Sequence, residues 1–173
     1  MQIVRDGLRI VTAKKDELEE LDAIYSEACG HYKFDCARPI LPPTVCLTKG
    51  DIPNGGKREN YEMLSIYLSG VLVGYTSVYR DFPGKRAVQL MFFYISDACA
   101  ESGCRRAAAE MMIDYFRDAG YGCMRILLSL RNWRELEFWF DCGFDRVTDI
   151  RTSGDLTDGA TGIIGLEHRY KAV

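Results

Sequence analysis

Two hydrophobic periodicities alternate along the chain. Apolar side chains recur every three or four residues over Lys15–His31 and over Gly103–Ala119, which predicts two amphipathic helices. Asn132 and Gly143 are the expected caps of a third, shorter helix. Alternating or continuous apolar runs predict strands at Leu8–Thr12, Glu62–Leu68, Val71–Tyr79, Ala87–Ile95, Met124–Leu130, Asp145–Ile150 and Ile163–Tyr170. This order predicts an α+β domain in which helices cover a mixed sheet.

The segment Arg38–Asn60 interrupts this pattern. Four of the five prolines fall within it, together with three glycines. Proline lacks the amide proton that helices and central strands need, so the segment is expected to be a long loop or a broken helix. Loops of this length often wall binding sites, although a plain connector fits the same residues.

Composition indicates an ordinary cytosolic domain, which we expect to span residues 1–173. The chain is 47% hydrophobic and 27% charged, values typical of globular proteins. No apolar run is long enough to cross a bilayer and the first residues do not resemble a signal peptide, so we expect no membrane partner. A net charge of −3 argues against nucleic acid and is compatible with a cationic substrate. Seven cysteines without a C-x-x-C pair predict reduced thiols, and two histidines without paired-ligand spacing predict no metal site.

The start of the second long helix has the features of an anion site. The first turn of a helix exposes unpaired backbone N–H groups, to which the helix dipole adds partial positive charge. At this turn Gly103 permits close approach of a phosphate, and Arg105 and Arg106 can add charge-assisted contacts. An ordinary helix start with solvated arginines fits equally well. Cys104 is an alternative candidate here, as a reactive thiol at a helix N-terminus.

Two motifs resemble those of the GCN5-related N-acetyltransferase (GNAT) family. The first, R/Q-x-x-G-x-G/A, corresponds to Ala100-Glu101-Ser102-Gly103-Cys104-Arg105. The second, N-x-x-A-x-x-F-Y-x-x-x-G-F, corresponds to residues 132–144, where the pairs Asn132-Trp133 and Phe138-Trp139 resemble a bacterial branch of the family. The resemblance covers essentially the whole chain. It implies a mostly antiparallel mixed sheet, a splay between two central strands and helices on both faces.

The resemblance also implies a co-substrate, acetyl-CoA, and the residues that bind it. The backbone near Tyr94, Ile95 and Ser96 would pair with the pantetheine arm like an added strand. Asn132 would contact the pantetheine as well. The pyrophosphate would lie against the backbone amides of Ser102, Gly103, Cys104, Arg105, Arg106 and Ala107. The expected partner is a small amine or peptide acceptor, and family members often form homodimers.

Four positions depart from the family pattern. Ala100 replaces the Arg or Gln of the first motif, and Arg105 replaces its second small residue. Trp139 stands where many members have a tyrosine general acid, and Gln89 stands where histone-type members have a glutamate base. Other candidates for proton transfer are Tyr94, Glu62, Ser129 and Tyr79. Each of these is also an ordinary strand residue.

The leading hypothesis is an acetyl-CoA-dependent N-acetyltransferase in which an amine attacks the thioester directly. A backbone N–H of the Tyr94–Ile95 region would polarise the carbonyl, and Arg38–Asn60 would wall the acceptor site. Aminolysis of a thioester depends more on positioning than on strong acid–base help, so the departures do not exclude catalysis. The alternatives are a non-catalytic sensor of acyl-CoA or CoA and a scaffold without ligand. A polyamine, an aminoglycoside, an amino acid and a protein N-terminus all remain open as acceptors.

Overall fold

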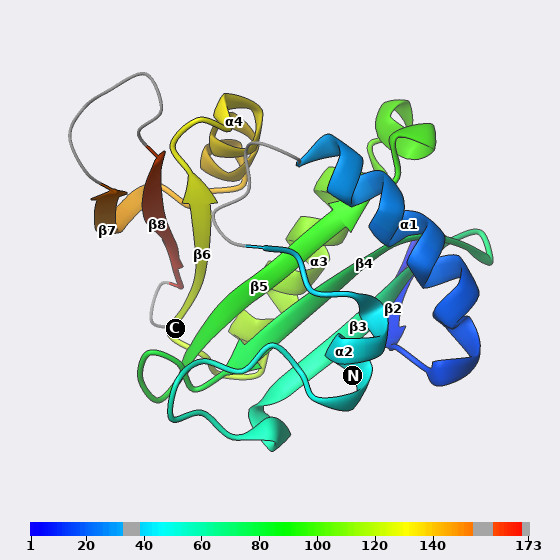
Figure 1. Cartoon of the computed structure of the whole chain (residues 1–173), viewed down its shortest axis with the longest axis horizontal. Helices are drawn as coiled ribbons and strands as arrows, with labels where there is room; N and C mark the ends of the chain where they lie inside the picture. Colours follow the sequence, from blue (N-terminus) through cyan, green and yellow to red (C-terminus); the bar gives the residue numbers. More distant parts are fainter. Residues whose placement is uncertain (33–38, 154–160, 171–173) are drawn as a thin grey trace.

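A single eight-stranded sheet forms the centre of the structure, a computed structural model that describes residues 1–32, 39–153 and 161–170. The strands are β1 (Gln2–Arg5), β2 (Leu8–Thr12), β3 (Tyr61–Leu68), β4 (Val71–Arg80), β5 (Ala87–Ile95), β6 (Cys123–Ser129), β7 (Arg146–Ser153) and β8 (Thr161–Arg169). Their order across the sheet is β1-β2-β3-β4-β5-β6-β8-β7 (Figure 1). Only the β5–β6 pair is parallel among these described strands. The mostly antiparallel mixed sheet is therefore confirmed.

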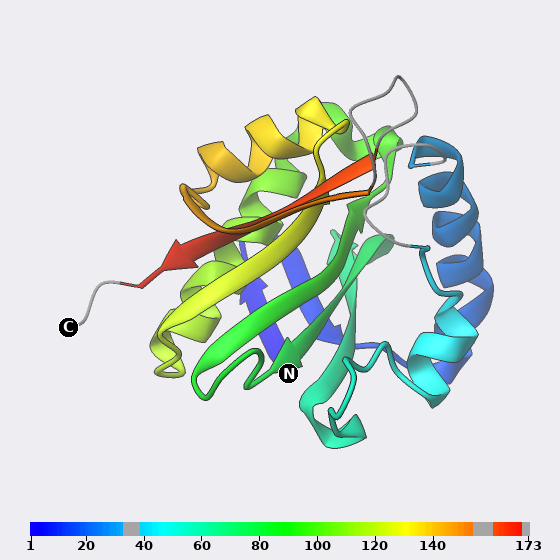
Figure 2. The ribbon, with the colours of Figure 1, turned by 60° about the vertical axis from the view of Figure 1, so that its left-hand side comes forward.

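Helices cover both faces of this sheet, as the resemblance implies (Figure 2). One face carries α1 (Leu18–His31) and α2 (Pro43–Thr48), and the other carries α3 (Cys104–Asp118) and α4 (Trp133–Asp141). Short 3₁₀ turns lie at η1 (Lys15–Glu17), η2 (Arg58–Asn60) and η3 (Asp97–Ser102). Each face has its own hydrophobic core because successive strand residues point to opposite sides. In β3, for example, Met63 packs with α1 and the neighbouring Leu64 belongs to the core under α3 and α4.

The two central strands separate toward their carboxyl ends. The β5–β6 ladder joins only Ala87–Leu90 to Cys123–Ile126. Beyond it, β5 stays with β4 up to Ile95, whereas β6 stays with β8 up to Ser129. Figure 1 shows the two arrowheads much farther apart than the two beginnings. The predicted splay is confirmed, and it leaves the end of β5 without a neighbour on its β6 side among the described residues.

The structure corrects several predicted boundaries. The pattern gave no strand before Leu8, but Gln2–Arg5 pairs with it as β1. The predicted helix Lys15–His31 begins as the 3₁₀ turn η1 before α1. Of the segment 38–60, Arg38 lies outside the described residues, and the rest is a long loop that contains only the short α2 and η2, as the prediction of a long loop or a broken helix allows. In the part of the chain that the structure describes, no helix has the length and hydrophobicity to cross a membrane.

Candidate functional site

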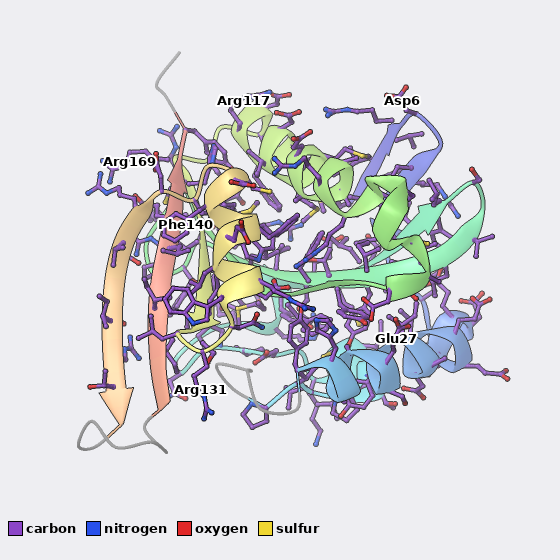
Figure 3. All side chains as sticks on the ribbon, turned by 90° about the horizontal axis from the view of Figure 1, so that it is seen from above. Asp6, Glu27, Arg117, Arg131, Phe140 and Arg169 are labelled. Carbon is purple, nitrogen blue, oxygen red and sulfur yellow. The ribbon has the colours of Figure 1, made fainter. Side chains whose placement is uncertain are left out.

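A cavity of about 170 Å³ opens where β5 and β6 separate, and we call it the splay cavity. It is lined from five elements: the end of α1, the end of β5 and the starts of η3, α3 and α4. The lining residues are His31, Tyr32, Tyr94, Ile95, Ser96, Asp97, Arg105 and Glu135. Figure 3 shows α1 and α4 on opposite sides of the sheet. Side chains from both faces therefore meet at this cavity.

The free edge of β5 presents the backbone of Ile95. The N–H of Ser96 donates to the carbonyl of Val73 on β4 at 2.8 Å. A Cβ added at Gly74 of β4 would collide with the carbonyl oxygen of Tyr94, so that carbonyl also faces β4. Because backbone groups alternate in direction along a strand, those of Ile95 point the other way, toward β6. Of the three residues expected to pair with pantetheine, Ile95 is thus the one whose backbone groups point away from β4 and have no strand partner among the described residues.

Glu27 of α1, labelled in Figure 3, holds the end of β5 in place. Its carboxylate accepts hydrogen bonds from the Tyr94 hydroxyl at 3.1 Å, the Ser96 hydroxyl at 2.9 Å and the Asp97 N–H at 2.7 Å. Burial raises the pKa of Glu27, but these bonds outweigh it and hold the pKa below its ordinary value. Burial and the neighbouring Glu27 raise the pKa of Tyr94 well above its ordinary value. The Tyr94 hydroxyl therefore stays protonated and is held as a hydrogen-bond donor to Glu27.

The start of α3 retains only part of the predicted anion site. Gly103 precedes the helix with φ of 70°, a conformation that favours glycine. The N–H of Cys104 donates to the Ser102 hydroxyl at 3.2 Å, and the N–H of Ala107 donates to the Gly103 carbonyl at 3.2 Å. The first-turn amides of Arg105 and Arg106 have no acceptor within the helix. The Arg106 side chain pairs with Asp141 of α4 at 3.3 Å, so it lies along α4.

The Arg105 side chain meets Glu135 at the splay cavity. Its guanidinium pairs with the Glu135 carboxylate and lies 3.9 Å from the ring centre of Phe138. Glu135 also accepts hydrogen bonds from the Tyr32 hydroxyl at 3.0 Å and from the Trp139 indole N–H at 3.1 Å. Glu135 is only 5% exposed, and its carboxylate is compensated by hydrogen-bond donors from the end of α1, from α3 and from α4. Sequence reasoning missed Glu135, although it occupies the alanine position of the second motif.

The remaining candidates are not among the residues that line the splay cavity. Glu62 of β3 accepts from the Met1 amino group at 2.7 Å and pairs with Arg80. Burial raises the pKa of Glu62, but these partners and Thr12 outweigh it and keep the pKa below its ordinary value. Through β4, Glu62 is in register with Leu90 of β5, five residues or about 16 Å from Ile95. The structure thus does not bring Glu62 to the cavity.

Tyr79, Ser129 and Asn132 all have local structural roles. The Tyr79 hydroxyl accepts the N–H of Lys57, which ties the segment after α2 to β4. The Ser129 hydroxyl accepts the N–H of Arg131 at 3.2 Å in the turn after β6. The Asn132 side chain accepts the N–H of Glu135 at 3.1 Å and so caps α4 as the sequence predicts.

A second, smaller pocket of about 40 Å³ lies on the α1 and α2 face of the sheet. It joins residues 39–41 and α2 to the bulged part of the β4–β5 ladder. Its lining residues are Pro39, Ile40, Leu41, Cys46, Asp51, Tyr75, Ser77, Met91 and Phe92. The buried Tyr75 hydroxyl has no hydrogen-bond partner in the described ranges 1–32, 39–153 and 161–170. The segment predicted to wall an acceptor site therefore does border a pocket next to β5.

All the cysteines that the structure describes are buried or half-buried. The structure describes six of the seven cysteines, all except Cys36, and none of these six forms a disulfide. Burial raises the pKa of the Cys104 thiol, which opposes the reactive-thiolate alternative despite the adjacent helix start. Within the described residues, no three His, Cys, Asp or Glu side chains are grouped to hold a metal ion.

Solved structures with this architecture identify the fold. The ribosomal-protein-S18-alanine N-acetyltransferase from Escherichia coli superposes with a TM-score of 0.70, at 16% identity and 96% coverage of each chain. A GCN5-related N-acetyltransferase from Kribbella flavida superposes with a TM-score of 0.65, at 15% identity, covering 95% of this chain and 98% of that chain. The chain has the GNAT fold. A third GNAT-fold neighbour is a ribosomal L7/L12 alpha-N-protein acetyltransferase in complex with coenzyme A, with a TM-score of 0.71, 10% identity and coverage of 94% and 95%.

The identities of 10–16% limit what this likeness establishes. No protein-family model matches the sequence, and no curated protein matches it. The GNAT fold is established by the superpositions, and the resemblance seen in the sequence is confirmed at that level. Activity rests on the residues of the site itself.

Proposed function

We propose that this chain is an acetyl-CoA-dependent N-acetyltransferase that transfers the acetyl group to an amine by direct attack in a ternary complex. The observation that carries the proposal is the splay between β5 and β6. It leaves the backbone of Ile95 without a strand partner on the β6 side among the described residues, and α3 begins nine residues later at Cys104, directly after Gly103. A free strand edge can bind an extended amide chain by strand addition, and a helix start can bind a phosphate. CoA contains both groups: its pantetheine arm is an extended amide chain, and a diphosphate follows it.

In this proposal the backbone of Ile95 binds the pantetheine arm, and its N–H polarises the thioester carbonyl. The free amides of Arg105 and Arg106 bind the diphosphate, aided by the positive end of the helix dipole. The amine enters from the α1 and α2 face, through the pocket that contains Asp51 and Tyr75. The carboxylate of Asp51 suits a cationic amine, but these residues do not distinguish a polyamine, an aminoglycoside, an amino acid and a peptide N-terminus.

The proposed reaction lacks the usual acid and base of the GNAT motifs, because Trp139 and Gln89 occupy their positions. Trp139 donates its indole N–H to Glu135 and has no titratable proton, and Gln89 has no useful basicity. Tyr94 lines the splay cavity, but its hydroxyl donates to Glu27 and its raised pKa makes it a weak acid, so water is the proposed proton source for the thiolate. The incoming amine can lose its proton to water, since positioning supplies most of the acceleration in such reactions. The reduced thiols predicted from the sequence fit a cytosolic reaction.

The proposal is tested by ligand binding and turnover together. Acetyl-CoA and CoA are each expected to raise the melting temperature, because a ligand that binds the folded state stabilises it. Thiol release from acetyl-CoA is then followed with a panel of amines, and reactions without amine correct for the protein's own seven cysteines. Binding without release for every amine would support the sensor alternative. No thermal shift with either compound would leave only the scaffold.

A pair of charge reversals locates the diphosphate. Arg106→Glu is expected to raise the KM for acetyl-CoA about tenfold, with little change in kcat, because it adds negative charge beside the phosphate. Lys85→Glu makes the same change in net charge in the exposed turn between β4 and β5, and it is expected to leave KM unchanged. Equal effects of the two variants would contradict a diphosphate at the start of α3.

A further inference from the structure

Two positions that are small in the GNAT motifs carry charged side chains in this chain. Arg105 occupies the second Gly/Ala position of the first motif, and Glu135 occupies the Ala position of the second. The two motifs lie on different helices, yet the structure joins these two residues in one ion pair. Both departures from the pattern therefore belong to a single feature, which we call the latch.

The latch lies where a ligand between β5 and β6 would have to pass. Arg105 and Glu135 both line the splay cavity beside Ile95, whose free backbone is the proposed contact for pantetheine. Tyr32, at the end of α1, reaches Glu135 from the opposite face of the sheet. The same tyrosine packs edge-on against Tyr94, with ring centres 5.8 Å apart. The splay is thus bridged from α1 through Glu135 to α3.

The closed latch is stabilised by the hydrogen bonds, the ion pair and the ring contact that its two side chains make. Glu135 accepts hydrogen bonds from Tyr32 and Trp139 in addition to its ion pair, and the Arg105 guanidinium stacks on Phe138. A buried carboxylate with all these partners is stable, whereas one that loses its cation is left with an uncompensated charge. When Arg105 leaves, Glu135 keeps its hydrogen bonds from Tyr32 and Trp139, and Arg105 needs another anion as its partner. The diphosphate proposed to bind at the start of α3 is such an anion, and guanidinium groups bind phosphate in a bidentate manner.

We propose that the Arg105–Glu135 latch closes the acyl-CoA site, and that the CoA diphosphate opens it by replacing Glu135 as the partner of Arg105. This inference rests on the proposed function, because it assumes that acyl-CoA binds at the splay. If only a fraction of the molecules is open, the apparent dissociation constant for acetyl-CoA is the intrinsic one divided by that fraction, so closure weakens the apparent affinity. Weakening the Glu135 side of the latch while keeping Arg105 is therefore expected to tighten acetyl-CoA binding.

The test is a calorimetric titration of acetyl-CoA into wild type, Glu135→Gln and Glu135→Ala. Glu135→Gln retains an acceptor for Tyr32 or Trp139 and is the variant more certain to fold, while Glu135→Ala restores the small residue of the motif. Each is expected to bind acetyl-CoA about tenfold more tightly than wild type. The matched control is Glu137→Gln, an exposed carboxylate of the same helix, which is expected to bind as wild type does.

A second measurement needs no change at the latch. Trp133→Phe removes the exposed tryptophan and leaves Trp139, the indole that donates to Glu135, as the only one in the chain. Saturating acetyl-CoA is expected to shift the emission of Trp139 with the dissociation constant found by calorimetry. An unchanged emission, or Glu135 variants that are folded and bind no more tightly than wild type, would overturn the latch.

The outcomes separate the latch from the proposed function. Tighter binding by the Glu135 variants without thiol release for any amine would support the latch and contradict the proposed transferase activity. Turnover by wild type, with no gain in affinity in the variants, would contradict the latch and support the proposed transferase activity. Absence of acetyl-CoA binding in wild type and in every variant would remove both.

Discussion

At the scale of single residues, Glu27 has the clearest energetic role near the site. Its carboxylate joins α1 to the end of β5 through three hydrogen bonds, from Tyr94, Ser96 and Asp97. Hydrogen bonds to a charged group contribute about 1.5–3 kcal/mol when buried, and less when water competes. Since Glu27 is half-buried, we expect Glu27→Gln to lower the free energy of unfolding by about 1–2 kcal/mol at pH 7. Chemical denaturation measures this, with the exposed Glu137→Gln as the control.

The same substitution has a defined pH dependence. The folded-state pKa of Glu27 lies below its ordinary value of 4.5, so the carboxylate stabilises the fold fully above that pH. The contribution is lost as the pH falls through the lowered pKa. The difference in stability between wild type and Glu27→Gln should therefore be constant from pH 7 to about pH 5 and shrink below pH 4. A difference that stays constant down to pH 3 would contradict the assigned role of Glu27.

The site was only partly predictable from individual residues. The helix start at Gly103 was predictable from local sequence features, whereas the binding role of the strand end at Ile95 was implied only by the resemblance to the GNAT motifs. It could not predict that Arg105 meets Glu135, since these residues are thirty positions apart and join only after α3 and α4 pack together. Likewise, nothing local indicates that Glu62 is held by Arg80 and Met1, at a distance from the cavity.

At the scale of elements, the close approach of β4 to β5 sets the position of the free strand edge. A Cβ at Gly74 would lie 2.7 Å from the Cδ1 atom and 3.0 Å from the Cα atom of Ile95, and it would also collide with the Tyr94 carbonyl. Because two of these contacts are backbone, the strands must move apart to relieve them. We expect Gly74→Ala to cost about 2–3 kcal/mol of stability and to weaken acetyl-CoA binding by displacing Ile95.

The control for this substitution is Gly84→Ala. A Cβ at Gly84 meets no atom within 4 Å, so we expect its stability to change by less than about 0.5 kcal/mol. Thermal melts and acetyl-CoA titrations of both variants make the comparison. A Gly74→Ala protein with the stability of Gly84→Ala would mean that β4 and β5 are less closely paired than described.

Most long elements were predictable because their hydrophobic period is strong. β2 and β5 have the predicted bounds, and α3 has the buried stripe of Ala108, Met111 and Met112 that the period of 3.6 predicts. β1 was missed because its four residues are mostly exposed and gain their hydrogen bonds only from β2. α2 was obscured by prolines, although Pro43 lies in its first turn, where the missing amide proton has no cost.

At the scale of the whole molecule, one sheet serves two hydrophobic cores. Leu21 of α1 is fully buried in the core on one face, and Leu166 of β8 is fully buried in the core on the other. Adjacent residues of β5 contribute to different cores, with Phe93 on the α3 side and Tyr94 on the α1 side. Loss of either core therefore removes the support of the same strands. The cores are expected to unfold together, as the predicted single domain over residues 1–173 requires.

Leu21→Ala and Leu166→Ala test this coupling from opposite faces. Each removes a fully buried leucine and is expected to cost about 2–5 kcal/mol. Trp139 is 1% exposed in the α3 and α4 core, whereas Trp133 is 75% exposed, so unfolding changes the fluorescence mainly through Trp139. If the molecule is one cooperative unit, Leu21→Ala lowers the fluorescence midpoint and the circular-dichroism midpoint equally, although Leu21 lies across the sheet from Trp139. A circular-dichroism transition that moves alone would instead mean that α1 and α2 unfold as a separate unit, and that ligand binding at the splay can couple to their opening.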